Sequence, residues 1–302
     1  MDYKGVEVED TYYECTDLII SRVLLTAISE RVALQEAIFL SGFSVITAAP
    51  IQACIDRLVH PSETPDGRPG VLIQLNIPSS RNHENFEKAV SDRLFIAPHL
   101  PTCSLFNATP RDQEKFRIPV GDRIRRWGDG FEVEDEIDGR KVYRIPVMTG
   151  EMIVEKFLGA CEGTDGVLEV ITENQSSSII AMENAANRVL NEVDGAAIFC
   201  FPLGGVVGAK VGGINYKNER VTIPHIYCPT IREKVPESKI CEGAKSAFEF
   251  PIVGLNENVV KNAMRLAIEA IAGTPGVKKI TAPSFGGQWG KRKIYLKDVL
   301  RA

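Results

Sequence analysis

The sequence predicts an α+β fold made of two split βαβ lobes that are related by internal duplication and joined by a β-ribbon. Two observations support this prediction. The order strand, helix, strand, strand, helix, strand occurs once in each half of the chain, and a glycine-containing stretch of alternating charge separates the two occurrences. Parallel strands joined by a helix need a right-handed crossover, so both helices of a lobe pack on one face of its sheet. We therefore expect an N-terminal lobe with the ribbon over residues 1–146 and a C-terminal lobe over residues 147–302.

The first half contains two helical patterns and four strand-like runs. Apolar residues recur at helical spacing over residues 30–40, and Gly42 follows as a helix terminator. A second helix is expected over residues 82–93. The expected strands are 22–27, 43–47, 71–77 and 94–97.

The second half repeats this order. Helices are expected over 178–191 and 257–272, and Asn256 is placed to cap the second of them. The expected strands are 167–172, 196–201, 247–253 and 277–282. Between the halves, residues 116–154 predict the ribbon, because Asp138-Gly139 between alternating runs is the usual signal of a β-hairpin.

Composition excludes several classes of protein. The 302 residues include 35 basic and 40 acidic side chains, a mildly acidic balance that argues against nucleic acid or an anionic membrane as the main partner. The N-terminus is charged and no apolar run approaches the span of a bilayer, so we expect a cytoplasmic protein. Seven scattered cysteines without a Cys-x-x-Cys pair, and four scattered histidines, predict reduced core cysteines and no metal site.

Glu249 is the acid that stands out, because it interrupts the apolar run 247–255. Apolar neighbours disfavour the charged form of a carboxyl group, which is how a proton-transferring acid is made. The alternative is an edge strand with the carboxylate in water, and Pro251 favours such an edge because it cannot donate to a ladder. Strand alternation places Ala247, Pro251 and Val253 on the face of Glu249, and Phe248, Phe250 and Ile252 on the other.

Three further motifs have a structural and a functional interpretation. The loop 61–70 contains Arg68, which either completes a turn-rich loop or clamps a carboxylate or phosphate. The glycine-rich run 201–213 could bring backbone N–H groups close to a ligand, but it is neither a Walker motif nor a dinucleotide fingerprint. The serines at 176–178 are either helix caps or a nucleophile cluster, and their position before an apolar helix favours caps.

Several of these motifs together resemble those of the formylmethanofuran:tetrahydromethanopterin formyltransferase family, along nearly the whole chain. The ten-residue loop and the ribbon are the most specific of them. The segments that carry the resemblance are 5–7 with Thr11, 63–70, 128–131, 134–136, 138–141, 145–147, 150–151, 153–155, 227–230, 254–257, 263–265 and 285–287.

This resemblance implies a fold, a reaction and a set of site residues. The fold would be two ferredoxin-like lobes in a homo-oligomer, a tetramer built as a dimer of dimers, with no metal and no tightly bound cofactor. The reaction, part of one-carbon metabolism in methanogenesis or C1 oxidation, moves a formyl group from methanofuran to N5 of tetrahydromethanopterin, both of them carrier substrates. Glu249 would be catalytic as the modulator of N5. We expect the substrate-binding residues to be Gln175, Phe201, Gly204, Gly205, Lys210 and Thr230, with backbone N–H groups near Gly204 and Gly205 contacting the oxyanion or the substrate.

The sequence also departs from the family pattern, mainly in expected binding loops. Residues 44–52 lack the family's cysteine and acid, Leu203 is inserted after Phe201-Pro202, and Gln288-Trp289 replaces lysine-leucine after Gly286-Gly287. This pattern predicts a diverged paralogue. Two alternatives to the family reaction follow from it: a formyltransferase with a different one-carbon carrier, and a catalytically silent structural or regulatory subunit.

Overall fold

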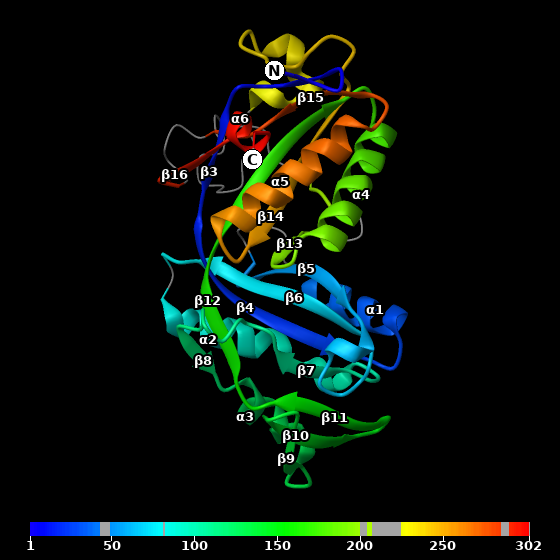
Figure 1. Ribbon diagram of the computed structural model, residues 1–302, viewed down its shortest axis with the longest axis vertical. Coiled ribbons are helices and arrows are strands. Elements are labelled where there is room, and N and C mark those ends of the chain that lie inside the picture. The colour runs from blue at the N-terminus through cyan, green and yellow to red at the C-terminus, as the bar shows by residue number, and fades with distance from the viewer. Residues whose placement is uncertain (43–48, 81, 200–203, 207–224, 285–289, 302) are drawn as a thin grey trace. The chain divides into compact units, whose positions relative to one another are not determined.

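The computed structural model describes residues 1–42, 49–80, 82–199, 204–206, 225–284 and 290–301, and the chain divides into two compact units (Figure 1). Unit 1 contains Met1–Thr16 and the described residues from 164 onward, and unit 2 contains residues 17–42 and 49–163. These units do not follow the halves 1–146 and 147–302, because the first residues of the chain pair with its last strands. β2 (Val6–Val8) lies parallel to β15 (Val277–Thr281), and β3 (Tyr12–Cys15) lies antiparallel to β16 (Arg292–Tyr295).

The central sheet of unit 1 has the strand order β15, β12, β14, β13, and all of these neighbours are antiparallel. Helices α4 and α5 pack side by side on one of its faces (Figure 1). The remaining elements of this unit are β1 (Asp2–Tyr3), the part of β12 (Leu158–Thr172) from residue 164, α4 (Gln175–Glu192), β13 (Ala196–Ile198), η4 (His225–Tyr227), η5 (Pro229–Lys234), β14 (Ser246–Gly254), α5 (Glu257–Ala272) and α6 (Leu296–Val299).

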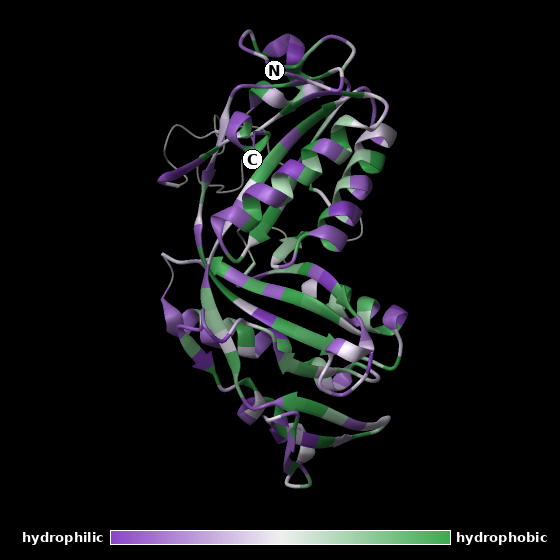
Figure 2. Ribbon diagram, viewed as in Figure 1, coloured by the Kyte–Doolittle hydropathy of each residue, from purple (hydrophilic) through white to green (hydrophobic). Residues whose placement is uncertain are grey.

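Side-chain alternation along β12 and β14 separates an apolar face from a polar one. The residues packed against α4 and α5 are Leu168, Val170, Phe248, Phe250 and Ile252, all buried in the same core. The alternation expected around Glu249 is therefore confirmed, and Glu249 projects to the face that the helices do not cover. Figure 2 shows these strands as mainly hydrophobic ribbons interrupted by hydrophilic bands.

Unit 2 contains a sheet of the same kind, with the strand order β5, β6, β4, β7 and antiparallel neighbours. Helices α1 and α2 pack against this sheet. Its elements are β4 (Asp17–Thr26), α1 (Glu30–Ser41), β5 (Gln52–Val59), η1 (Pro61–Glu63), β6 (Gly70–Pro78), α2 (His83–Leu94), η2 (Ala97–His99), β7 (Ser104–Asn107), β8 (Phe116–Ile118), α3 (Val120–Ile124) and η3 (Arg125–Gly128).

The predicted ribbon belongs to unit 2 and consists of β9 (Val133–Ile137), β10 (Arg140–Val147) and β11 (Gly150–Glu155). Asp138 and Gly139 have φ angles of 48° and 71°. Positive φ at both central residues is what a two-residue hairpin turn requires, so the predicted hairpin is confirmed. β11 joins the ribbon to the sheet through a parallel contact of Val154 with Leu105 in β7.

Two strand predictions in the first half need comment. The predicted strand 94–97 is wrong: Leu94 ends α2 and Ala97–His99 forms a 3₁₀ turn with Pro98 in its first turn, so the fourth strand is β7 instead. Proline lacks the N–H that a strand ladder needs, which favours the turn. The predicted strand 43–47 lies outside the described residues, and the strand next to β6 is β5, which the sequence pattern did not identify.

Side chains cap the long helices as the sequence indicates, with one exception. Asn256 accepts a hydrogen bond from the Val259 N–H, as predicted. At α4 the cap is Asn174 rather than one of the serines, and Ser178 instead bonds to the hydroxyls of Thr172 at 2.6 Å and Ser246 at 2.8 Å. Ser178 is therefore a structural residue that ties the helix to β12 and β14.

Within the part of the chain that the structure describes, no helix is both long and apolar enough to cross a bilayer. The same residues contain no cluster of three metal-ligating side chains. Their cysteines are free thiols, and four of them, Cys15, Cys54, Cys103 and Cys161, are buried.

Candidate active site

Two glutamates face each other at the centre of the unit 1 sheet. Glu249 in β14 stands directly opposite Glu169 in β12. The N–H and C=O groups of Glu249 both bond to Val206 on its other side, each at 2.9 Å. Glu169 and Glu249 therefore form a non-hydrogen-bonded antiparallel pair, the kind in which Cα atoms lie about 4.5 Å apart and side chains come closest.

Within the part of the chain that the structure describes, little compensates a negative charge on either glutamate of this pair. Glu169 is 1% exposed, and its Oε2 atom is buried without a hydrogen-bond partner. Burial, followed by the nearby Glu249 carboxyl, raises the pKa of Glu169 well above its ordinary value. Burial likewise raises the pKa of Glu249 to about 7. At neutral pH the pair therefore does not carry two negative charges, because like charges directly opposite each other destabilise a sheet.

Asp165 precedes Glu169 by four residues in β12, so its side chain projects to the same face of the sheet. Tyr13 of β3 contacts Asp165 there. The Asp165 carboxylate accepts hydrogen bonds from the Thr16 N–H at 2.6 Å and from the Tyr13 hydroxyl at 3.1 Å. Burial nevertheless raises the pKa of Asp165 to about 7. Tyr13 is close enough to Asp165 and Glu249 that both acids, together with burial, raise the pKa of its phenol. The phenol is thus a neutral O–H donor beside the carboxyl pair.

On the other side of Glu169, the acid Glu9 is fully compensated. Thr281, which stands opposite Glu169 in β15, donates its hydroxyl to Glu9 at 2.6 Å. Lys239 bonds to Glu9 at 3.0 Å, and Lys279 lies 3.7 Å from it and 3.0 Å from Glu7. These hydrogen bonds and lysines lower the pKa of Glu9 despite its partial burial. Among the described residues, the cations of this face therefore pair with other acids, and none of them pairs with Glu169.

Gly204 and Gly205 lie against the strand that carries Glu249. A Cβ on Gly205 would stand 1.7 Å from the Met182 sulfur and 3.0 Å from the Glu249 carbonyl oxygen, and Gly204 has a φ of 74°. Only glycine allows the backbone to pass between α4 and β14 at this distance. The structure thus brings three of the predicted site residues together: Gly204, Gly205 and Glu249.

The segment 225–241 adds Thr230 and Cys228 to this region. Tyr227 and Ile240 pack on Ile171 of β12, two residues from Glu169. Cys228 is near enough to Glu169 to contribute to its raised pKa, and the Cys228 sulfur lies 3.2 Å from the exposed Thr230 hydroxyl. Thr230 therefore borders the carboxyl pair through Cys228.

Of the other predicted site residues only Gln175 is described, and it does not lie on this face. Gln175 is the exposed first residue of α4, and α4 packs on the opposite face of the sheet. Phe201 and Lys210 lie outside the described residues. Sequence reasoning missed Glu169, although a usable signal was present: it is a lone acid inside the apolar run 167–171, as Glu249 is in its own strand.

The edge-strand interpretation of Glu249 is wrong. β14 is an interior strand, flanked by β12 on one side and by β13 and Val206 on the other. Proline has no N–H to donate, and at Pro251 an N–H would point toward the side of β13. On that side the neighbouring chain contacts β14 at Glu249, through Val206, and again from Ile252, through β13. Pro251 lies between these two contacts. Proline thus occupies the gap between two partners.

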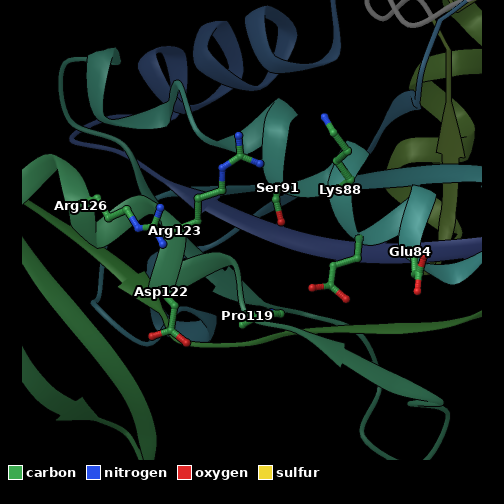
Figure 3. A pocket seen from close by; sticks show the side chains of 8 residues that line it. Glu84, Lys88, Ser91, Pro119, Asp122, Arg123 and Arg126 are labelled. Atoms are coloured by element: carbon green, nitrogen blue, oxygen red, sulfur yellow. The ribbon is translucent and has the colours of Figure 1, made fainter.

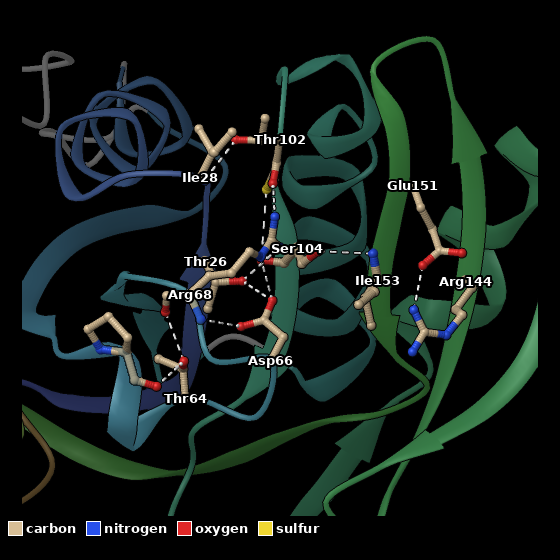
Figure 4. A network of polar contacts seen from close by, with 12 residues as sticks. Thr26, Ile28, Thr64, Asp66, Arg68, Thr102, Ser104, Arg144, Glu151 and Ile153 are labelled. Carbon is tan, nitrogen blue, oxygen red and sulfur yellow. Dashed lines mark hydrogen bonds and ion pairs between the residues drawn. The ribbon is translucent and has the colours of Figure 1, made fainter.

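Arg68, the other candidate from the sequence, is used inside unit 2. Figure 4 shows its guanidinium bonded to Asp66 at 2.8 Å, to the Thr102 carbonyl at 2.8 Å and to the Thr26 hydroxyl at 3.0 Å. Thr64 closes the loop by donating its hydroxyl to the Arg68 carbonyl at 2.8 Å. The arginine therefore fastens the loop to the end of β4, in agreement with the structural interpretation.

A separate surface pocket of about 420 Å³ lies in unit 2, between α2 and the α3–η3 segment (Figure 3). Three basic side chains line it together with three acidic ones, so its lining has no net charge. These are Lys88, Arg123 and Arg126 with Glu84, Glu87 and Asp122. Such a balanced surface shows no preference for an anionic or a cationic ligand.

Comparison with known proteins defines the class. The profile described as formylmethanofuran-tetrahydromethanopterin formyltransferase matches residues 1–147, and the profile of the proximal lobe of the same family matches residues 150–299. The chain therefore belongs to the formylmethanofuran–tetrahydromethanopterin formyltransferase family, a family of acyl-transferring enzymes, and the resemblance inferred from the motifs is confirmed.

Individual relatives cover the whole chain. It is 37% identical over 304 residues to the formyltransferase of Methanosarcina barkeri, covering 99% of this chain and 100% of the relative. It is 39% identical over 307 residues to that of Methanocaldococcus jannaschii, with 99% of each chain covered. The solved M. barkeri enzyme superposes with a TM-score of 0.91 at 36% identity, over 99% of this chain and 100% of that one. A chain of the formyltransferase/hydrolase complex FhcABCD from Methylorubrum extorquens, solved with methylofuran, gives 0.87 at 28% identity, over 99% and 98%.

Proposed function

We propose that this chain transfers a formyl group from N-formylmethanofuran to N5 of tetrahydromethanopterin, with Glu249 moving the protons. The observation that supports this role is the placement of Glu249: an acid with a pKa near 7, half-buried in an interior strand beside Gly204 and Gly205. A general acid or base works best when its pKa lies near the working pH.

The reaction needs a proton acceptor and a proton donor in turn. The N5 lone pair attacks the formyl carbon, a C–N5 bond forms and the carbonyl oxygen becomes an oxyanion. The C–N bond to methanofuran then breaks, N5 loses one proton and the departing amine gains one. Glu249 accepts the N5 proton and returns it to the amine nitrogen, so its protonation state is restored at the end of each turnover.

Neutral donors on this face suit the developing oxyanion. The backbone amides of Gly204 and Gly205 approach Glu249 without an intervening side chain. Losing one donor to an oxyanion typically lowers the rate about a hundred- to a thousandfold. We assign substrate contacts also to Thr230, which borders the pair through Cys228, and to Gln175, Phe201 and Lys210 from the family resemblance.

We further propose that the halves 1–146 and 147–302 arose by duplication of one ferredoxin-like lobe, with residues 1–16 packing in unit 1 and residues 147–163 in unit 2, and that the protein is a cytoplasmic homotetramer. Support for duplication comes from the strand orders, since β15-β12-β14-β13 and β7-β4-β6-β5 correspond position by position. Light scattering on the purified protein tests the tetramer, and a monomer at micromolar concentration would contradict it.

A direct assay tests the proposed reaction. The purified protein is incubated with N-formylmethanofuran and tetrahydromethanopterin, and formation of the N5-formyl product is followed. Turnover supports the proposal. A folded protein that binds both carriers without turnover would indicate a silent paralogue, and turnover only with another reduced pterin or formyl donor would indicate a changed carrier.

A further inference from the structure

The position opposite Glu249 is occupied by an almost fully buried acid, Glu169, which has no cation partner among the described residues. Glu169 is 1% exposed, stands in the central strand β12, and has a buried Oε2 without a hydrogen-bond partner. A carboxylate in such a place lacks both water and a compensating donor, and an unpaired buried charge costs several kcal/mol. A neutral carboxylic acid avoids most of this cost.

We propose that Glu169 is a positioning residue of the site and stays protonated at neutral pH. The proton on Glu169 is not exchanged during turnover. Glu249 is the member of the pair that gains and loses a proton. This inference rests on the proposed function of Glu249. Two carboxyl groups in a non-hydrogen-bonded cross-strand pair cannot both ionise cheaply, and the more buried one keeps the proton.

The groups around the pair do not reverse this assignment. From β3, Tyr13 presents a neutral phenol, and from β12 itself Asp165 adds a further acid. From the segment 225–241, Cys228 raises the pKa of Glu169 further. From β15, Lys279 directs its ammonium group to Glu7 and Glu9.

The protonation state of Glu169 affects the pKa of Glu249. When Glu169 is neutral, only burial raises the pKa of Glu249, so this pKa stays near neutrality. If Glu169 were ionised, its charge would oppose the ionisation of Glu249 and would also oppose the oxyanion of the transition state. The protonated partner therefore lets one carboxylate work in a buried site.

Infrared spectroscopy of the unliganded protein tests the inference. The C=O stretch of a protonated carboxyl group should remain at pH 8 in the wild-type protein and in Glu249→Gln, and should disappear in Glu169→Gln. Labelling with ¹³C-carboxyl glutamate should shift this band in the wild-type protein, which separates it from Asp165 without any substitution. Glu36→Gln is the matched control and should keep the band, because Glu36 is also buried with an unpartnered Oε2 but lies in helix α1, where it has no cross-strand partner.

The second measurement follows the Glu249 carboxylate band through its titration. In Glu169→Gln we expect its midpoint to stay within about half a pH unit of the wild-type value, since glutamine imitates the neutral acid. A downward move of more than one unit would show that Glu169 is charged in the wild-type protein and would overturn the proposal, as would the absence of a labelled band at pH 8. Neither readout requires turnover, so a protein that fails the formyl-transfer assay still tests Glu169, and a negative infrared result leaves the assay of Glu249 unaffected.

Discussion

Gly205 lies so close to Met182 that a methyl group on the glycine would stand 1.7 Å from the methionine sulfur. The contact joins α4 to the segment that pairs with Glu249, so it sets how close the backbone comes to the acid. A side chain here forces either the methionine or the backbone to move.

Gly205→Ala should therefore destabilise the protein by about 1–3 kcal/mol, the usual range for an overpacked core, and should lower the formyl-transfer rate. Chemical denaturation measures the first effect. Gly273→Ala is the control, because a Cβ there meets nothing closer than 3.5 Å and the residue has helical backbone angles. Equal stability of the two variants would contradict the packing argument.

Glu249→Gln should lower the rate of formyl transfer about 10²- to 10⁴-fold, the usual contribution of a general acid or base. Gln keeps the size of the side chain but cannot carry the proton. Carrier binding, measured by calorimetry, should change much less than the rate. Glu242→Gln, a substitution at an exposed position of the same unit, should leave the rate unchanged. A fully active Glu249→Gln variant would remove this residue from the mechanism.

Much of this site was readable from the sequence because alternation in a strand is a local property. The faces of the strand 247–253 and the helix 257–272 are where the pattern places them. The pairing of Glu169 with Glu249 was not readable, because it depends on the register between strands almost eighty residues apart. The prediction of an edge strand from Pro251 was wrong for the same reason, because a strand is an edge only if no other strand pairs with one of its sides. The contact with Val206 comes from a glycine-rich run whose sequence does not predict a strand. The strand β5 was missed because its pattern is broken by Asp56 and Arg57 at an irregularity in the pairing.

Asp56 forms a buried fork with Arg22 in unit 2. The Arg22 guanidinium donates to both carboxylate oxygens, at 2.8 and 2.9 Å, and Gln74 donates to one of them at 2.7 Å. Asp56→Ala leaves the arginine charge buried, and we expect a loss of about 3–5 kcal/mol in the free energy of unfolding.

Replacing both partners gives the matched comparison. Arg22→Met with Asp56→Leu removes both charges, and this double variant should be more stable than Asp56→Ala alone. Urea denaturation of Arg22→Met, Asp56→Leu, the double variant and the wild type measures the coupling. If the double variant lost as much as the sum of its single changes, the two residues would not form an energetic pair.

Arg68→Ala should destabilise unit 2 without changing carrier affinity. The guanidinium holds Asp66, Thr26 and the Thr102 carbonyl, so its removal leaves the buried Asp66 carboxylate without its ion partner. Losing a charge-assisted hydrogen bond typically costs about 1.5–3 kcal/mol. Thermal unfolding and calorimetric titration with each carrier separate the two roles, and Arg31→Ala on the exposed side of α1 is the control. Weaker carrier binding at unchanged stability would instead favour the clamp interpretation.

Asp165 should make stability fall as pH rises through the acidic range. Burial raises its pKa from an ordinary value of 3.8 to about 7, so between these values the folded protein keeps a proton that the unfolded chain has released. Stability that depends on this proton is complete below about pH 4 and is lost as the pH rises through 7. Asp165→Asn cannot titrate, so its free energy of unfolding relative to that of the wild type should rise by about 3 kcal/mol between pH 5 and pH 8. Glu169 and Glu249 are present in both the wild-type protein and Asp165→Asn. Their contributions to the pH dependence therefore cancel in the difference, which reports the contribution of Asp165. A constant difference across this range, or one that falls with pH, would show that Asp165 is ionised at pH 5 in the folded protein and that the hydrogen bonds from Thr16 and Tyr13 outweigh its burial.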